Sequence, residues 1–457
     1  MSLLKPFRHL ACLIPLLAAP LEAAPNILFI YLDDFGWKDT GYMGSDFYET
    51  PNLDALAKGG MVFTDAYSNA ANCAPARASL LSGQYTPRHR IFNVGTRPRG
   101  NAKHRSFEQF TGTTVLDDKI VTWAETLKKA GYRTGMFGKW HLGPDPTTQG
   151  FDVAVEHQKL TPKYGHYGPN GEYLADMLTD RTIDFIEESK DRPWCAYLAH
   201  FGVHTPLDPK KDLLPKYEAK KPGKLHDHVV MATMIQAIEA RDRLGERDDT
   251  VIVFFSDNGG YGPATDMDPL WGYKGTYFEG GIRVPLFVNW PGVVKAGGTC
   301  DEPVIGTDLY PTFCEIAGAK LPDQPLDGRS LVPLLRGEIG TFGERPIYWH
   351  FPAYLQSYSV YDEQRDPLFR SRPVAAVRIG DYKLKEYHED GHVALYNLKD
   401  DIRERRNLAE AMPDKRDELL EQLHQWQKDI DAPIPRTANP EFDAEAERES
   451  LDKANND

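Results

Sequence analysis

The chain has 457 residues, 41% of them hydrophobic and 11% aromatic, which is enough for one large α/β domain and a smaller second one. Its formal net charge of −14 at pH 7 argues against a nucleic-acid-binding protein, because such proteins normally present a basic face. The overall charge does not exclude a local cationic pocket for a small anion.

The N-terminus has the features of an export signal. Two basic residues, Lys5 and Arg8, precede an apolar segment over residues 10–21, and alanines follow it. The apolar segment is too short to span a bilayer comfortably. We therefore expect residues 1–24 to be a signal peptide and the mature protein to be exported, either periplasmic or secreted, without stable membrane insertion.

Short apolar runs then alternate with amphipathic stretches of helical length. The runs predict buried strands at 26–32, 194–199, 250–256 and 284–290. The amphipathic stretches predict helices, for example at 121–130, 173–189 and 229–244. This alternation favours a large, mostly parallel sheet sandwiched by helices, in which ligands bind beyond the carboxyl ends of the strands.

Beyond Arg345 the pattern changes to short alternating strands, which indicates a small antiparallel sheet. The strands are expected at 374–378, 382–387 and 393–398, and a helix at about 413–430. From Glu441 the chain carries seven acidic residues against two basic ones, which favours disorder. The predicted organisation is a catalytic domain over 25–345, a smaller C-terminal α+β subdomain over 346–437 and a disordered acidic tail over 438–457.

Acidic pairs follow two of the predicted strands. Asp33 and Asp34 come directly after the first run, and Asp257 and Asn258 come directly after the third. Either pair alone is as readily explained by helix capping. Together they offer three carboxylates and an amide oxygen, donors that suit Ca²⁺ or Mg²⁺ better than Zn²⁺. So much negative charge converging in a protein interior is costly without a cation.

A cysteine motif begins at Asn72 and reads NCAPARASLLSG, with Pro75, Arg77 and Gly83 following Cys73. Taken alone, Cys73 would most often be a buried, inert thiol, because free cysteine packs as a small hydrophobe. The four cysteines outside the N-terminal segment do not form a disulfide framework in a chain of this length. Pairing of Cys300 with Cys314 is left open by their spacing.

Taken in order, the Asp33-Asp34 pair, the Cys73 motif and Asp257-Asn258-Gly259 resemble the type I, formylglycine-dependent sulfatases of the alkaline phosphatase superfamily. The resemblance extends from about residue 26 to residue 350. Further family motifs are matched by GYRTGMFGKWHLG at 131–143, by His204-Thr205-Pro206 and by Lys274-Gly275. One departure is Ala76, where many members carry Ser or Thr.

The resemblance implies that Cys73 is oxidised to formylglycine by a formylglycine-generating or maturase enzyme. It also implies one divalent cation, Ca²⁺ in preference to Mg²⁺, bound by Asp33, Asp34, Asp257 and Asn258 together with residue 73. The aldehyde hydrates to a diol, and one hydroxyl, activated by Asp257, attacks sulfur to form a covalent sulfate ester.

The remaining side chains have distinct implied roles. The second hydroxyl of the diol passes its proton to His141 as sulfate is expelled. Arg77 and Lys139 hold the diol oxygens, Lys274 binds the sulfate oxygens, and His204 protonates the leaving alcohol. Lys139, His204 and Lys274 are thus expected to bind substrate as well.

An exported member of this family fits a sulfated oligosaccharide or polysaccharide as substrate. The aromatic and imidazole cluster Trp349-His350-Phe351-Pro352 makes His350 a candidate sugar-binding residue. Further candidates for sugar subsites, each as readily ordinary surface residues, are His89, Arg97, Arg99, His104, His166 and Arg370.

Two alternatives remain. One is a phosphodiesterase or phosphonate monoester hydrolase of the same superfamily. The other is a sulfated-glycan-binding protein in which Cys73 stays unmodified.

Overall fold

The computed structural model describes residues 24–162, 164–239, 248–358 and 364–456. The predicted signal peptide lies outside these residues except for Ala24. The larger domain is built on an eight-stranded sheet in the order β5-β4-β6-β1-β7-β8-β2-β9. Its strands are β1 (Asn26–Leu32), β2 (Met61–Phe63), β4 (Arg133–Gly138), β5 (Val153–Glu156), β6 (Trp194–Ala199), β7 (Thr250–Ser256), β8 (Leu286–Asn289) and β9 (Gly298–Cys300).

The central strands of this sheet run parallel to one another. β1 pairs in parallel with both β6 and β7, and β4 pairs in parallel with β5 and β6. Only β8 is reversed, since it pairs antiparallel with β7 and with β2. The mostly parallel sheet predicted from the apolar runs is therefore confirmed.

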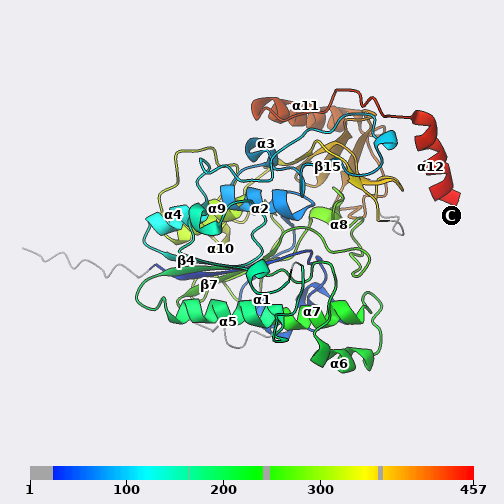
Figure 1. The fold of residues 1–457 in the computed structure, drawn as a ribbon. Helices are drawn as coiled ribbons and strands as arrows, with labels where there is room; N and C mark the ends of the chain where they lie inside the picture. The colour runs from blue at the N-terminus through cyan, green and yellow to red at the C-terminus, as the bar shows by residue number, and fades with distance from the viewer. Residues whose placement is uncertain (1–23, 163, 240–247, 359–363, 457) are drawn as a thin grey trace, which may run out of the picture.

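Helices cover both faces of the sheet, with α5 and α7 on one side and α2, α4 and α9 on the other (Figure 1). Side chains of β1 alternate between two hydrophobic cores, Ile27, Phe29 and Tyr31 facing one and Leu28 and Ile30 the other. Burial on both faces explains why this strand is apolar throughout. The helices are α1 (Pro51–Lys58), α2 (Cys73–Ser82), α3 (Thr86–His89), α4 (Trp123–Lys129), α5 (Leu174–Glu187), α6 (Leu214–Glu218), α7 (Val229–Glu239), α8 (Glu279–Ile282), α9 (Leu309–Ile316) and α10 (Val332–Leu335).

A second, antiparallel sheet lies in the C-terminal part of the chain, as predicted. Its strand order is β11-β14-β15-β16, and the helix α11 (Pro413–Asp429) contributes Leu419 and Leu423 to its hydrophobic core. Two short pairs, β3 with β10 and β12 with β13, lie outside both sheets. These strands are β3 (Ala66–Tyr67), β10 (Val304–Ile305), β11 (Ile347–Phe351), β12 (Leu355–Gln356), β13 (Phe369–Ser371), β14 (Val374–Ile379), β15 (Tyr382–Tyr387) and β16 (Val393–Asn397).

The acidic tail departs from the predicted disorder, because residues Ala444–Asn456 form helix α12. The tail is held by polar contacts with the body of the protein. Glu447 pairs with the buried Arg372 at 2.7 Å, and Ser450 Oγ lies 3.2 Å from His104 Nε2. An acidic composition predicts disorder only where its charges lack partners, and here Glu447 joins Asp366 and Glu389 around the guanidinium of Arg372.

Cys73, Cys195, Cys300 and Cys314 are all unpaired, so the disulfide that spacing left open is absent from the structure. Among the described residues, no helix is both long and apolar enough to cross a membrane.

A buried network of charges joins the two sheets. Glu279, at the start of α8, accepts hydrogen bonds from Tyr67 Oη at 2.6 Å and from Lys383 Nζ of β15 at 2.8 Å, and it also pairs with Arg283. Burial alone would raise the pKa of Glu279, but Lys383 and Arg283 outweigh burial and hold it at about 2. Glu279 is therefore an anion on which cations from both domains converge.

We expect Glu279→Ala to lower the free energy of unfolding by about 3–5 kcal/mol, because removing one partner strands the remaining buried charges. Urea denaturation measures this change. The matched control is Glu418→Ala, whose carboxylate pairs with Lys415 on the exposed face of α11 and should affect stability little. Equal losses for the two variants would contradict the role assigned to Glu279.

Candidate active site

Four neighbouring parallel strands end at the same edge of the large sheet and present polar residues there. Asp33 follows β1 and Asp257 follows β7, and the preceding residues Leu32 and Ser256 are paired in register. Lys139 directly follows β4, whose last residue pairs with the last residue of β6. The prediction that both acidic pairs meet beyond the carboxyl ends of the strands is confirmed.

Glycine is required at position 138, the last residue of β4, which directly precedes Lys139. Gly138 has φ 122°, and a Cβ at this position would overlap the carbonyl oxygen of Ala199 on the neighbouring strand. A larger residue would push the two strands apart and displace the lysine.

Helix α2 and one loop complete the site. Cys73 is the first residue of α2 and is only 1% exposed, and Arg77 lies one turn further along the helix. The loop before α8 carries Lys274 and is fixed by main-chain hydrogen bonds, from Lys274 N–H to Gly260 and from Gly275 N–H to Ala71.

Each of the three buried carboxylates has its own cation. Lys139 Nζ lies 2.5 Å from Asp33 Oδ2, and Lys274 Nζ lies 2.6 Å from Asp34 Oδ2. Arg77 donates to Asp257 Oδ2 through Nη2 at 2.9 Å and through Nε at 3.2 Å. The three ion pairs balance the charge of these six side chains, so charge alone does not demand a metal here, contrary to the expectation from the sequence.

The ion pairs set the protonation of these groups. Burial would lower the pKa of Lys139, but Asp33 outweighs burial and raises it, so the ammonium stays charged. Burial would raise the pKa of Asp33, but the nearby Lys139 and His204 outweigh burial and bring this pKa well below its ordinary value. Burial and the nearby Asp33 charge raise the pKa of Asp257, whereas its ion pair with Arg77 at 2.9 Å lowers this pKa and favours the carboxylate.

Buried oxygen atoms that lack a hydrogen bond indicate where a cation would fit. Asp33 Oδ1 and Asn258 Oδ1 are buried and accept no hydrogen bond from the described residues. Asn258 Nδ2 donates to Asp34 Oδ1 at 2.9 Å, which fixes the amide and leaves its oxygen free. Because hard oxygen donors suit Ca²⁺ or Mg²⁺, the set of residues fits the cation expected from the sequence.

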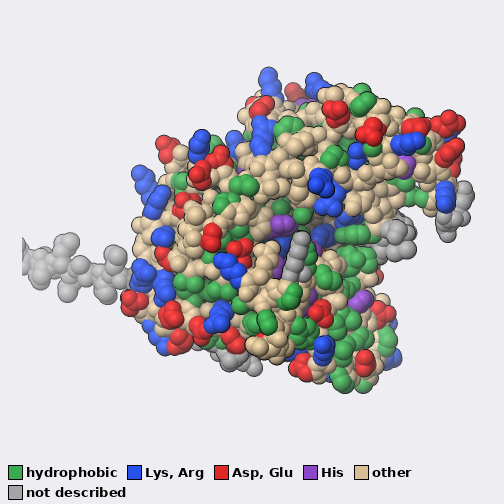
Figure 2. All heavy atoms as spheres, in the orientation of Figure 1, with side chains coloured by type: hydrophobic (Ala, Val, Ile, Leu, Met, Phe, Trp, Pro, Cys, Tyr) green, Lys and Arg blue, Asp and Glu red, His purple; other side chains and the backbone are tan. Residues whose placement is uncertain are grey.

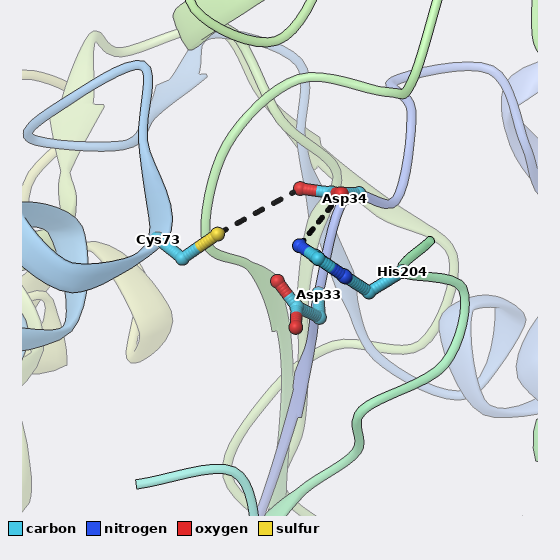
Figure 3. A group of neighbouring side chains, drawn as sticks. All are labelled: Asp33, Asp34, Cys73 and His204. Carbon is cyan, nitrogen blue, oxygen red and sulfur yellow. Dashed lines mark hydrogen bonds and ion pairs between the residues drawn. The ribbon is translucent and has the colours of Figure 1, made fainter. Parts of the chain in front are cut away.

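The side chains of Asp33, Asp34, Cys73 and His204 surround one small space (Figure 3). One potential ligand atom from each lies within 4.8 Å of the others. Asp257 lies at the edge of this group because its carboxylate is turned toward Arg77 and the main-chain N–H of Asp34. We expect the oxygen atoms of this site, and not the imidazole of His204, to bind the cation, because an imidazole is a poor ligand for Ca²⁺.

The two histidines of the site are neutral at pH 7. Burial lowers the pKa of His204 to about 4, and burial together with the Lys139 charge lowers that of His141 to about 2. His204 Nδ1 lies 2.5 Å from the carbonyl oxygen of Thr205, to which it donates. Its Nε2, 3.7 Å from Asp34 Oδ2, is therefore the nitrogen that faces the site.

The structure adds an aromatic support that the sequence motifs do not indicate. The ring of Phe201 stacks on His157 at 4.5 Å and on His166 at 5.1 Å, measured between ring centroids. Lys139 Nζ lies 5.6 Å from the centre of the same ring. Phe201 also accepts the main-chain N–H of His204, so it helps to orient both cationic and imidazole groups.

His350 does not belong to this site, contrary to the prediction from its aromatic neighbours. It is 1% exposed within β11, and its Nε2 lies 2.8 Å from the carbonyl oxygen of Pro433. The cluster Trp349-His350-Phe351 belongs to the core of the C-terminal sheet. The prediction failed because aromatic residues occur both in buried strands and on sugar-binding surfaces. His89 is likewise buried, against Ser79 of α2.

Histidine and basic side chains gather around a recess near the middle of one face of the molecule (Figure 2). Lys274 is the most exposed of the three site cations, with 11% of its side chain accessible. The three cations of the site are therefore largely shielded from solvent.

Comparisons with known proteins agree with this geometry. The sulfatase family model matches residues 25–319, and a model described as N-sulphoglucosamine sulphohydrolase, C-terminal, matches residues 270–431. A protein described as a sulfatase from Formosa agariphila is 32% identical over 85% of this chain and 85% of its own length. Human arylsulfatase A is 31% identical over 90% of this chain and 89% of its own.

Solved structures share the whole fold. A crystal structure of Ps i-CgsB in complex with k-i-k-neocarrahexaose has a TM-score of 0.74 at 27% identity, covering 94% of this chain and 98% of that one. A phosphonate monoester hydrolase of Agrobacterium radiobacter has the same fold, with a TM-score of 0.65 at 22% identity over 89% of this chain and 96% of that one.

The cation site can be tested without any activity measurement. Asn258→Leu keeps the size of the side chain but removes its oxygen, so Ca²⁺ affinity measured by calorimetric titration should fall by about tenfold or more. Asn258→Asp keeps an oxygen at the same place and should still bind Ca²⁺. Equal affinities of the unaltered protein and Asn258→Leu would place the cation elsewhere.

Proposed function

This chain belongs to the sulfatase family of the alkaline phosphatase superfamily, and we propose that its sulfatase activity releases inorganic sulfate from a sulfated oligosaccharide or polysaccharide. The observation that carries this proposal is the meeting of Cys73, three carboxylates and three cationic side chains at the carboxyl ends of neighbouring strands. No single residue of the set is informative, but their arrangement provides a nucleophile position, a cation site and an anion clamp together.

Asp33, Asp34, Asp257 and Asn258 would hold one divalent cation, with residue 73 as a further ligand. We favour Ca²⁺ over Mg²⁺ because the chain offers several oxygen ligands of its own, whereas Mg²⁺ usually keeps several waters and binds only one or two carboxylates. When bound, the cation supplies Lewis-acid polarisation of the ester oxygens. Because three side-chain cations already balance the three carboxylates, the added charge makes the pocket net positive, which suits an anionic ester.

Residue 73 is the proposed nucleophile after its thiol has been converted to formylglycine by a formylglycine-generating or maturase enzyme. The hydrated aldehyde supplies two hydroxyls, whereas serine has one and would stay esterified. The short distance of 3.9 Å from Cys73 Sγ to Asp34 Oδ1 supports a place beside the cation. Arg77 and Lys139 would hold the hydroxyl oxygens, and Asp257 would accept a proton from the attacking one.

The remaining residues act on the substrate. Lys274 Nζ lies at the mouth of the site and would bind the sulfate oxygens by charge. His204 would protonate the leaving alcohol through Nε2, since a bound anion beside it stabilises the imidazolium and raises its pKa. His141, whose Nδ1 is buried and accepts no hydrogen bond from the described residues, would accept the proton that is lost as sulfate leaves.

A carbohydrate substrate and an exported location are supported by less direct observations. The structural neighbour Ps i-CgsB was solved with a neocarrahexaose, and the N-terminal residues have the pattern of an export signal. Both features favour an extracytoplasmic enzyme that acts on a sulfated polysaccharide fragment.

A phosphodiesterase or phosphonate monoester hydrolase of the superfamily is the second candidate, because such an enzyme shares the fold. Many phosphoryl-transfer relatives have histidine among their metal ligands, whereas this chain has Asn258 after Asp257, which favours sulfate. A sulfated-glycan-binding protein with an unmodified thiol is the third.

One experiment separates these candidates. Protein isolated with its modification should release sulfate from 4-nitrophenyl sulfate faster than it cleaves bis(4-nitrophenyl) phosphate, and the peptide containing residue 73 should be about 18 Da lighter than the thiol form. Cys73→Ala should abolish both reactions, whereas Cys314→Ala, another buried thiol, should keep them. A faster phosphodiester reaction would reverse the ranking, and an inactive protein with an intact thiol would favour the glycan binder.

We expect Lys274→Ala to lower kcat/KM for 4-nitrophenyl sulfate by about a hundredfold or more, because an anion clamp in a sheltered site is lost. Lys210→Ala, which removes a lysine paired with Asp176 elsewhere on the surface, is the control and should leave kcat/KM unchanged. A loss of less than about threefold for Lys274→Ala would exclude the proposed sulfate contact.

A further inference from the structure

Arg370, in β13, is a buried arginine without a counterion. It is 6% exposed, and no carboxylate of the described residues lies within ion-pairing distance of it. Its Nε donates to the carbonyl oxygen of Gln356 at 2.8 Å, and its Nη1 donates to that of Lys274 at 3.1 Å. A guanidinium held only by neutral acceptors in a protein interior is costly unless an anion reaches it.

Five other buried arginines of the described residues are neutralised, and Arg105, at 9% exposure, is an exception. Arg77 pairs with Asp257, Arg283 with Glu279, Arg345 with Asp308, Arg372 with Glu389 and Arg378 with Asp65. Tyr67, for Arg283 and Arg378, and these carboxylates raise the pKa of the five arginines, whereas burial lowers that of Arg370.

The guanidinium of Arg370 lies next to the proposed sulfate clamp. It contacts the backbone of Lys274, whose ammonium group pairs with Asp34 of the proposed cation site. A Cβ added to Gly275 would come within 2.9 Å of Arg370 Nη1, so the glycine lets the guanidinium approach the loop.

An aromatic wall adjoins this charge. The guanidinium carbon of Arg370 lies 3.8 Å from the ring centre of Tyr358, which in turn stacks on Tyr273 at 5.7 Å and meets Tyr261 edge-on at 5.4 Å. Tyr358 and Tyr261 are partly exposed. The ring of Tyr358 thus supports the guanidinium of Arg370 through a cation–π contact and helps to fix its position beside the site.

We propose that Arg370, backed by Tyr358, binds a second anionic group of the substrate, a sulfate or a carboxylate carried near the ester that is cleaved. This inference rests on the proposed sulfatase function and narrows its substrates to those with two negative charges. The planar guanidinium suits either oxyanion through paired N–H donors.

Arg370 has a second effect through its hydrogen bond to Lys274, since it helps to position the sulfate clamp. A substitution that acted only through Lys274 would slow every sulfate ester alike. One that removed a binding site for a second anion would slow dianionic substrates selectively. The ratio between matched substrates therefore separates the two effects.

The test uses phenyl sulfates that carry a carboxamide, a carboxylate or a second sulfate at the ortho, meta or para position. For the unaltered enzyme with Ca²⁺, at least one dianionic isomer should exceed its carboxamide match in kcat/KM by about tenfold or more. Arg370→Gln should abolish this preference, and Arg370→Lys, which keeps the charge, should retain part of it. The substituent of the preferred substrate, a second sulfate or a carboxylate, identifies the anionic group that Arg370 binds.

The matched control is Arg105→Gln. Arg105 is 9% exposed and is also held by two main-chain carbonyl oxygens, those of Arg99 and Gly100, but it does not contact the Lys274 loop. The Arg105→Gln variant should therefore keep the preference for dianionic substrates. Thermal unfolding of each variant identifies any that fails to fold, in which case Arg370→Lys carries the comparison.

The inference is overturned if the unaltered enzyme prefers no dianionic isomer, if the preference survives in Arg370→Gln, or if that variant slows all substrates equally. A failure of the proposed function gives a different result, since the modified, calcium-loaded enzyme would then hydrolyse none of the phenyl sulfates.

Discussion

Three ion pairs buried at one edge of a parallel sheet, Lys139 with Asp33, Lys274 with Asp34 and Arg77 with Asp257, constrain the rest of this structure. None of these charges is tolerable alone in the interior, so the segments that carry them have to meet. Two strand ends supply the acids, and a third strand, helix α2 and one loop supply the bases. The proposed cation site depends on this pairing, which leaves oxygens of Asp33 and Asn258 without a hydrogen bond from the described residues.

The C-terminal subdomain belongs to this arrangement as a structural partner of the site. Arg370 holds the carbonyl oxygen of Lys274, and Ser371 Oγ donates to that of Gly275 at 2.9 Å. Below this contact, Glu279 ties α8 to Lys383 of β15. The loop that bears Lys274, the proposed sulfate clamp, is thus held by contacts from β13 as well as from the larger domain.

The sequence predicts the parts of the fold whose burial is uniform. β1, β6 and β7 have the predicted bounds because a strand covered on both faces is apolar throughout, and the acidic residues after β1 and β7 mark its edge. The sequence does not predict β4, because this strand lies in a motif whose glycines and polar residues interrupt the apolar pattern. The sequence favours His350 over Arg370 as a sugar-binding residue, and the structure reverses this order, because only packing distinguishes a core imidazole from a guanidinium beside the site.

The hydrogen bond between Arg370 and Lys274 joins residues 96 positions apart, and the strand that supplies the arginine is synthesised after the loop that carries the lysine. Until that strand docks, the carbonyl oxygen of Lys274 lacks the guanidinium that holds it. This loop of the larger domain therefore reaches its final position only when the C-terminal strands have folded against it.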